Sequence, residues 1–361
     1  MSVEFHPLTI ADVKPETEDS VSISFTVPDE LRESFRHVPG QHVVVRADIG
    51  DTDVRRSYSI CSRPGDDALR IAVKRIPDGA FSTYATTQLM TGDILDVMAP
   101  IGEFTTTFEP TQARHHVMIA AGSGITPILS MVSTILQVEP STQVSLIYGN
   151  RTTQSIMFLE ELEALKNRYP TRLQVVHVLS REPHQVPLFQ GRVDAEKMHL
   201  LAEQLLDVGA VDEWYLCGPL EMVEDITTTL GQLGVPAGAV HSELFFDERI
   251  ESIVEPDGAA EGLTETSVTI DGRTSVVHID PDGPPILDYA RAVRPEVPFA
   301  CKGGMCATCK AVVVEGEATM AKNYALTDEE IEAGFILTCQ AHPKGTKALA
   351  IDYDVHGGIG R

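Results

Sequence analysis

The sequence predicts a multidomain protein: an antiparallel β-barrel, an α/β domain with a parallel sheet, and a small α+β domain. Three observations predict this order. Residues 1–108 hold short strands separated by turn residues, residues 109–250 alternate apolar strands with helical patterns, and residues 265–361 hold a hairpin and a cysteine-rich loop. A chain of 361 residues is also too long for one ordinary hydrophobic core.

The composition is that of a globular protein with an acidic surface. Apolar residues make up 43% of the chain and charged residues 22%, and the formal charge is −25. Because that charge repels phosphate backbones, we expect no nucleic acid partner. The N-terminus carries acids and lacks the apolar stretch of a signal peptide, and the uncharged residues 117–138 contain Gly-Ser-Gly and a proline. We therefore expect a cytoplasmic protein with no membrane span.

The first zone, residues 1–108, is rich in strand signals. The segment VSISFTV alternates apolar and hydroxyl residues, which is typical of a half-buried strand. The segments QHVVVRA, RRSYSIC, LRIAVKRI and ILDVMAP follow, separated by Gly, Pro and Asp. Several short strands with such turns predict a closed antiparallel barrel.

The second zone, residues 109–250, has a different hydrophobic pattern. Apolar strands such as HHVMIA and QVSLIYG alternate with helical patterns such as PILSMVSTIL and LEMVEDITTTL, which predicts βαβ repeats and a parallel sheet covered by helices. Residues 251–264 are acidic, small and turn-forming, and we interpret them as a linker. In residues 265–361, SVTIDGRTSVVHI predicts a hairpin and ILDYARAV a short helix.

The cysteine loop CKGGMCATC carries the most specific signal. Its spacing, C-x4-C-x2-C with a further cysteine later in the chain, is that of plant-type 2Fe–2S clusters. A structural zinc site is the alternative, but zinc ribbons show two C-x2-C knuckles and this chain has one. Gly303 and Gly304 allow positive φ angles and a close approach of the backbone. The predicted cluster ligands are Cys301, Cys306, Cys309 and Cys339.

A strand of the first zone carries Arg56-Ser57-Tyr58-Ser59. On its own this motif also fits an ordinary barrel strand with an aromatic cross-strand pair. A flavin would use the cation for its pyrophosphate, the aromatic face for its ring and the hydroxyl near the ring's reactive nitrogen. Further along, Lys74 ends a strand, and Gly79 and Ser82 open a helix whose N-terminus is a natural phosphate seat.

A second loop points to a dinucleotide. The segment Ala-Gly-Ser-Gly-Ile-Thr-Pro follows a strand and opens a helix, with Gly122 and Gly124 allowing close backbone approach and Thr126 as the expected N-cap. Cys217 and Gly218 likewise end a later strand, and a helix begins directly after them. A buried small hydrophobe is the alternative for Cys217.

Coenzyme choice depends on a 2′-phosphate site. Ser180 and Arg181 end a strand, and Arg151 follows the preceding one. A guanidinium offers a fork for phosphate and serine adds a hydroxyl donor, which favours NADPH over NADH. An exposed ion pair between Arg181 and Glu182 is the alternative.

Together these motifs resemble the ferredoxin–NADP reductase superfamily, followed by a plant-type ferredoxin domain, over nearly the whole chain. The resemblance implies that Arg56 and Ser82 hold the FAD pyrophosphate, that Tyr58 packs on the flavin and that Ser59 lies near its N5. It also places Cys217 beside the nicotinamide and an acid, Glu243, near the active site. It implies a β-grasp type of fold for the third domain. Ser59, Cys217 and Glu243 are thus the implied catalytic residues.

The order of the three domains resembles the reductase components of multicomponent oxygenases. The segments PFACKGGMCATC, NYALTDEEIEAGFILTCQAHP and IDYD are most similar to the reductase subunits of phenylacetyl-CoA ring epoxidases. We therefore expect an NADPH-dependent reductase that passes electrons through FAD and a 2Fe–2S cluster to an oxygenase partner. The alternatives are the reductase of another oxygenase, a stand-alone nitric-oxide or quinone reductase, and a non-enzymatic electron carrier or redox sensor.

Overall fold

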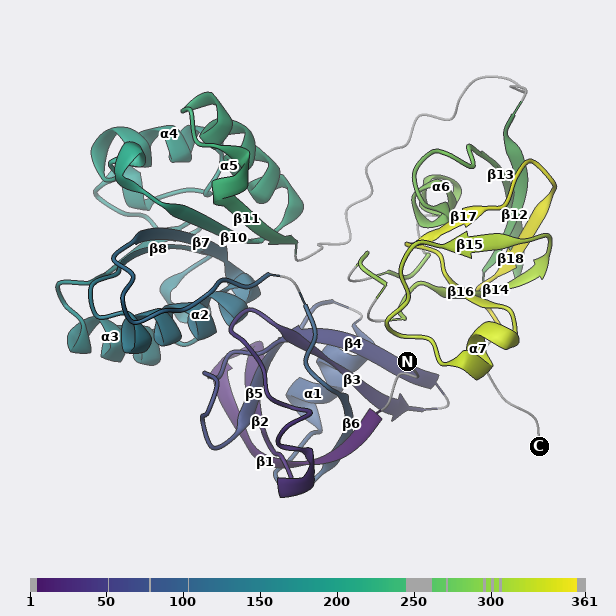
Figure 1. Cartoon of the computed structure of the whole chain (residues 1–361), viewed down its shortest axis with the longest axis horizontal. Coiled ribbons are helices and arrows are strands. Elements are labelled where there is room, and N and C mark those ends of the chain that lie inside the picture. The colour runs from purple at the N-terminus through teal and green to yellow at the C-terminus, as the bar shows by residue number, and fades with distance from the viewer. Residues whose placement is uncertain are drawn as a thin grey trace. The chain divides into compact units, whose positions relative to one another are not determined.

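The computed structural model describes residues 5–50, 52–77, 79–102, 104–244, 262–270, 272–294, 297–299, 302–304 and 307–355. These residues contain an antiparallel, a parallel and a mixed sheet (Figure 1). The chain divides into two compact units, His6–Val43 with Tyr58–Asp247, and Val44–Ser57 with the described residues of Glu248–Arg361. The predicted fold classes are confirmed. The predicted domain limits stay a prediction, and residues 251–261 of the predicted linker lie outside the described residues.

The first sheet has six strands in the order β4-β3-β6-β1-β2-β5. Alternate side chains, among them Leu8, Ile10, Ile23 and Phe25, are fully buried, as the period of a strand requires. An isolated bridge between Ile60 and Ile71 brings the residue after β4 next to β5, which closes the sheet as the turn pattern predicted. Its elements are β1 (Phe5–Thr17), β2 (Ser20–Thr26), β3 (His42–Ile49), β4 (Thr52–Ser59), β5 (Leu69–Lys74), α1 (Ala80–Thr87) and β6 (Ile94–Met98).

The parallel sheet has the order β11-β10-β7-β8-β9. In Figure 1, α2 and α3 lie on one side of it and α4 and α5 on the other. Alternate residues of β7 explain the two layers, because Met118 packs in the core that contains α2 and Ile119 in the core that contains α5. The elements are β7 (His115–Ala121), α2 (Ile125–Val138), β8 (Gln143–Asn150), α3 (Leu159–Arg168), β9 (Leu173–Leu179), α4 (Ala195–Gln204), β10 (Glu213–Gly218), α5 (Leu220–Gln232) and β11 (Val240–Leu244).

The strand order of this sheet reverses at β7. The chain runs outward from β7 to β8 and β9, then returns to place β10 on the opposite side of β7. The carboxyl ends of β7 and β10 lie side by side, since Ala120 pairs in register with Cys217. Ligands of open parallel sheets bind where the strand order reverses in this way.

The third sheet is mixed, in the order β13-β12-β18-β14-β16. The hairpin of β12 and β13 and the helix over ILDYARAV are confirmed. Strand β18 pairs parallel to β12, and α6 buries Ile286 and Leu287 in the domain core. The elements are β12 (Thr264–Ile270), β13 (Arg273–Ile279), α6 (Ile286–Val293), β14 (Lys310–Glu315), β15 (Ala318–Met320), α7 (Asp328–Glu332), β16 (Phe335–Leu337), β17 (Ala341–Pro343) and β18 (Leu349–Asp352).

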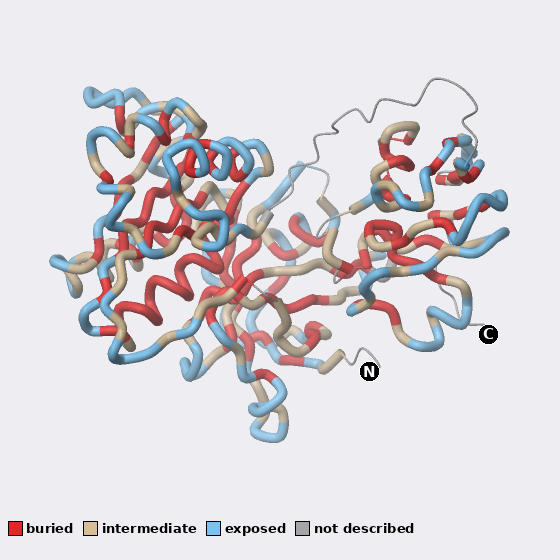
Figure 2. Tube along the Cα trace, turned by 45° about the horizontal axis from the view of Figure 1, so that its top comes forward, coloured by how far each residue is buried: buried red, intermediate tan, exposed pale blue. Residues whose placement is uncertain are grey.

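Burial follows these layers. Figure 2 shows buried residues along the inner segments of the trace and exposed residues in many of the connecting loops. The uncharged residues 117–138 form most of β7, a 3-10 turn over Gly122–Gly124 and helix α2, in agreement with the prediction of a strand, a turn and a helix. Among the described helices, none has the length and apolar character needed to cross a membrane.

Candidate active site and cluster loop

Two predicted catalytic residues meet although 184 positions separate them in the chain. Ser59, the last residue of β4, is buried, and its hydroxyl donates a hydrogen bond to Glu243 Oε2 at 3.2 Å. The preceding Tyr58 ring packs on Phe81 of α1, with 5.5 Å between ring centroids. The end of β4 therefore presents the Tyr58 ring and, one residue later, the Ser59 hydroxyl that contacts the Glu243 carboxyl of β11.

The environment of Glu243 favours its protonated form. Burial raises the pKa of this carboxyl to about 7, although the hydrogen bond from Ser59 acts in the opposite direction. Glu243 pairs in register with Cys217 of β10. Burial also raises the pKa of the Cys217 thiol well above its usual range, so this side chain is a small neutral group. Near neutral pH the Glu243 carboxyl can therefore gain or lose a proton, whereas the Cys217 thiol keeps its proton.

His42 is a further residue of this site, which the sequence analysis missed. Its Nδ1 lies 3.9 Å from Glu243 Oε1, and burial lowers its pKa to about 4, so the imidazole is neutral at pH 7. The only sequence signal was one polar residue at the start of the apolar run His-Val-Val-Val. A histidine on a strand is more often an ordinary core residue, so this signal is weak.

Buried polar atoms without a partner test whether FAD fits here. Among the described residues, Nε2 of His42 is buried and has no hydrogen-bond partner. Such atoms are rare in folded proteins unless a ligand or water satisfies them. A flavin with polar ring edges therefore fits the residues present.

The end of β5 and the start of α1 hold three residues that were predicted to bind a phosphate. Gly79 is the N-cap, and a Cβ there would overlap Ile76 and the hydroxyl of Ser82. Ser82 donates to the carbonyl of Gly79 and accepts from the amide of Ile76, each at 3.2 Å. Lys74 forms an ion pair with Asp19 at 3.5 Å. A side chain on Gly79 would thus displace the Ser82 hydroxyl from these two hydrogen bonds.

The glycine loops of the parallel sheet pack directly on each other. Gly122 has φ +55°, and a Cβ on Gly124 would overlap the carbonyl oxygen of Cys217. A Cβ on Gly218 would lie 2.5 Å from Cε of Met222. The loops after β7 and β10 thus meet through their backbones, and glycines at such a position also allow the close approach of a pyrophosphate.

The prediction for Thr126 as an N-cap was wrong. Gly124 precedes the first residue of α2, and Thr126 is the second residue of that helix, with its hydroxyl donating to the carbonyl of Ser123 at 3.0 Å. The reason is that the 3-10 turn Gly122–Gly124 runs straight into α2, so the helix begins earlier than the hydroxyl pattern indicates.

The candidate 2′-phosphate residues lie together at the carboxyl edge of the sheet. The amide of Arg181 donates to the carbonyl of Arg151 at 2.8 Å, and that of Ser180 to Asn150 at 2.9 Å. Both arginines are exposed. The carboxylate of Glu182 accepts instead from the amide and hydroxyl of Thr153, at 2.7 and 3.0 Å.

The cluster loop is described in part. Cys301 and Cys306 lie outside the described residues, and Cys309 and Cys339 are both buried. Thr338, the residue before Cys339, links the two backbone segments, because its amide and hydroxyl donate to the carbonyl of Cys309 at 3.2 and 2.9 Å. Two buried sulfur donors on a fixed backbone fit a cluster that thiolates bind.

The backbone of this loop is unusual. Gly304 has a positive φ of +78°, as expected, whereas Gly303 does not. Two residues that were not predicted also have positive φ, Lys302 with +46° and Ala307 with +51°. Non-glycine residues adopt this region at a cost in free energy, which the surrounding structure must offset. Such turns aim backbone N–H groups into one concave space, which suits the sulfurs of a cluster.

Within the smaller unit, β4 contacts the cluster loop. Nη1 of Arg56 donates to the hydroxyl of Thr308 at 3.2 Å, one residue before Cys309. Arg55 forms an ion pair with Glu330 of α7 at 3.2 Å and donates to the carbonyl of Ala325 at 3.2 Å. Arg55 and Arg56 thus belong to the same compact unit as the cluster loop.

Three family profiles match the chain in the predicted order. The oxidoreductase FAD-binding domain matches residues 7–106, the oxidoreductase NAD-binding domain residues 118–228, and the 2Fe-2S iron-sulfur cluster binding domain residues 268–344. These matches show the FAD, nicotinamide and cluster functions that the motifs predicted.

Relatives of known function match over almost the full length. A 1,2-phenylacetyl-CoA epoxidase subunit from Escherichia coli (strain K12) is 41% identical, over 98% of this chain and 99% of its own. The ferredoxin reductase component of 3-ketosteroid-9-alpha-monooxygenase from Rhodococcus rhodochrous is 36% identical, over 96% of both. The fold of phthalate dioxygenase reductase matches with a TM-score of 0.55 and 23% identity, over 96% of this chain and 98% of that one. The chain belongs to the family of reductase components of oxygenase systems, electron-transfer oxidoreductases that combine FAD-binding, NAD-binding and 2Fe–2S domains.

Proposed function

We propose that this reductase takes electrons from NADPH and passes them through FAD and its cluster to the oxygenase component of a phenylacetyl-CoA epoxidase. The 41% identity to a component of that epoxidase along the whole chain is the observation that carries the choice of partner. The reductase of another oxygenase is the second candidate, favoured by the 36% identity to a ketosteroid monooxygenase component. A cytoplasmic location, expected from thiols that bind a cluster rather than form disulfides, belongs to the same proposal.

The residues have separate roles in this proposal. Arg56, Lys74, Gly79 and Ser82 hold the pyrophosphate of FAD, and Tyr58 packs on the flavin. When bound, FAD accepts hydride from the nicotinamide and the cluster takes single electrons. Cys301, Cys306, Cys309 and Cys339 bind the irons of that cluster.

The hydroxyl of Ser59 and the carboxyl of Glu243 lie 3.2 Å apart and hold or release a proton beside the flavin. Cys217, small and neutral, leaves room for the nicotinamide, and Gly122, Gly124 and Gly218 admit the coenzyme backbone. Thr126 supports this loop through Ser123 rather than as a cap.

The choice of NADPH rests on Arg151, Ser180 and Arg181, which meet at one edge of the sheet. Replacing Arg181 by Ala removes a guanidinium that could bind the 2′-phosphate with two hydrogen bonds. We therefore expect KM to rise roughly tenfold or more for NADPH and little for NADH. Steady-state reduction of ferricyanide with each nucleotide measures this. Arg168→Ala, a change at an exposed arginine of the same domain, is the matched control. Equal changes for both nucleotides would move the 2′-phosphate site elsewhere.

Coupled turnover tests the partner. Mixed with a phenylacetyl-CoA epoxidase oxygenase component, the reductase is expected to consume NADPH only when phenylacetyl-CoA is present. A ketosteroid monooxygenase with its own substrate is the comparison. Coupling to the steroid system alone would replace the first candidate by the second, and no bleaching of the flavin by either nucleotide would favour a redox sensor.

A further inference from the structure

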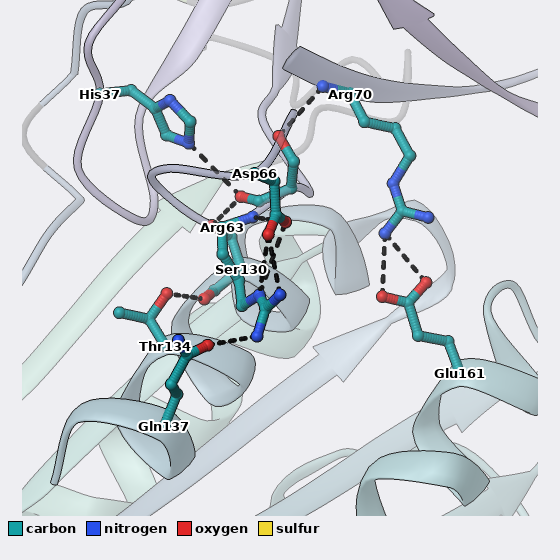
Figure 3. Close-up of polar contacts among 9 residues, drawn as sticks. His37, Arg63, Asp66, Arg70, Ser130, Thr134, Gln137 and Glu161 are labelled. Carbon is teal, nitrogen blue, oxygen red and sulfur yellow. Dashed lines mark hydrogen bonds and ion pairs between the residues drawn. The ribbon is translucent and has the colours of Figure 1, made fainter. Parts of the chain in front are cut away.

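A second set of polar contacts joins the barrel to the parallel-sheet domain, besides Ser59 and Glu243 (Figure 3). Nη2 of Arg70, on β5 of the barrel, donates to both carboxylate oxygens of Glu161 at 2.9 Å each. Glu161 lies in the first turn of α3, where the helix dipole also favours a negative charge. A barrel strand and a helix of the other domain therefore share one ion pair.

The surroundings hold Arg70 in place. Its amide donates to the hydroxyl of Ser62 at 3.0 Å, and its guanidinium carbon lies 5.2 Å from the centre of the Phe158 ring. Phe158 is buried and has φ +59°, a left-handed conformation that is costly for an aromatic residue. The packing around Phe158 must therefore offset this cost, which fixes the point where α3 begins.

The neighbouring loop of the barrel holds α2 as well. The hydroxyl of Ser130, fully buried on α2, donates to the carbonyl of Ser62 at 2.6 Å, and Arg63 donates to the side chain of Gln137 on the same helix (Figure 3). Cys61 and Ala72 of the barrel pack in the same apolar core as α2. The two helices that follow the candidate nucleotide-binding strands β7 and β8 are thus both attached to the barrel.

The ion pair is connected to the coenzyme edge through the chain itself. Arg151 follows β8, a capping box between Thr152 and Ser155 comes next, and Glu161 lies in the helix that follows. Within this segment Thr153 binds Glu182, next to Arg181. Any shift of the start of α3 against the barrel would also move the segment that carries Arg151.

We propose that Arg70 and Glu161 are positioning residues, whose ion pair fixes α3 and the Arg151 segment against the flavin barrel so that the nicotinamide meets the flavin. This rests on the proposed use of a nicotinamide coenzyme. Their side chains are 21% and 38% exposed, and pairs this exposed add little to stability. The expected effect is therefore on geometry, where a misplacement of about 1 Å can cost a large factor in rate.

The test uses the full-length holoprotein with Arg70→Gln, Glu161→Gln, both changes together, and the charge swap Arg70→Glu with Glu161→Arg. Anaerobic bleaching of the flavin at saturating nucleotide is expected to slow roughly tenfold in each single variant, with the nucleotide Kd changed less than about twofold. The double variant is expected to be no slower than the singles, and the swap to recover to within about threefold of the unchanged protein. Hydrogen exchange of residues 159–165 is expected to speed up in the singles and slow again in the swap.

Asp29→Asn is the matched control, because Asp29 pairs with Arg32 at 2.9 Å in an exposed turn of the barrel. It should leave both the bleaching rate and the exchange of α3 unchanged. Single variants with an unchanged rate and unchanged exchange would overturn the inference. So would losses that multiply in the double variant, or a swap that recovers neither reading while FAD content stays normal. Failure of the unchanged protein to bleach with either nucleotide would instead overturn the proposed function.

Discussion

The buried position of Glu243 changes the pKa of its carboxyl. Burial raises its pKa from 4.5 to about 7, so its ionisation costs more in the folded chain than in the unfolded chain. The stability that results from this difference is fully present below pH 4.5 and is lost as pH rises through 7. The burial of Glu243 therefore makes the stability of the fold depend on pH.

We expect Glu243→Gln to remove this dependence, because glutamine has no proton to lose. From pH 5 to pH 8 the unchanged protein should lose on the order of 2 kcal/mol relative to the variant. The thermal midpoints of both holoproteins over this range measure the effect, with the exposed Glu203→Gln as control. If the thermal midpoints of the variant and the unchanged protein change with pH in parallel, the ionisation of Glu243 does not destabilise the fold.

Residue chemistry was readable from the sequence where several residues form one pattern. Ser59 was predicted because it ends a recognisable strand motif, and its contact with Glu243 shows how folding joins two distant signals. His42 was missed because a single histidine in an apolar strand has no distinctive spacing. Only the fold reveals that its Nδ1 faces an acid from β11.

At the scale of elements, periodicity was sufficient for long strands and helices but not for short ones. The helix over ILDYARAV and the strands of the parallel sheet follow their apolar patterns. Helix α7 has five residues and was not predicted, although Thr327 and Glu330 form the capping box that could have revealed it. Strands β15 and β17 have three residues each, too few for a period, and they form through each other's hydrogen bonds.

The start of α1 permits a sharp prediction at this scale. In Gly79→Ala the new Cβ comes within 2.4 Å of Oγ of Ser82, so this hydroxyl must leave the position in which it binds Ile76 and Gly79, and the proposed phosphate site changes with it. We expect the purified variant to retain less than about a tenth of its FAD, because misplaced phosphate contacts lose their charge-assisted hydrogen bonds. The ratio of flavin to protein absorbance measures this. Gly231→Ala, where a Cβ meets nothing within 4 Å, is the control, and equal FAD contents would contradict a seat at α1.

At the scale of the whole molecule, the three domains separate two kinds of electron chemistry. The core that contains Cys309 and Cys339 consists of residues from β12 onward, and the two cores of the parallel-sheet domain contain none of these residues. Domains with separate cores can lose one function without losing the other. A change in the cluster domain should therefore leave the reaction between nucleotide and flavin in place.

Cys339→Ser tests this separation. A cluster of this type needs four thiolates, so the variant should lose its iron, and transfer to the oxygenase should fall at least about a hundredfold. Ferricyanide, which takes electrons from the flavin, should still be reduced by NADPH at close to the original rate. Iron content, visible absorbance and the two rates, measured on one preparation, distinguish the outcomes. Equal loss of both rates with FAD still bound would mean that cluster and flavin do not act as separate centres, because removing one would have disabled the other.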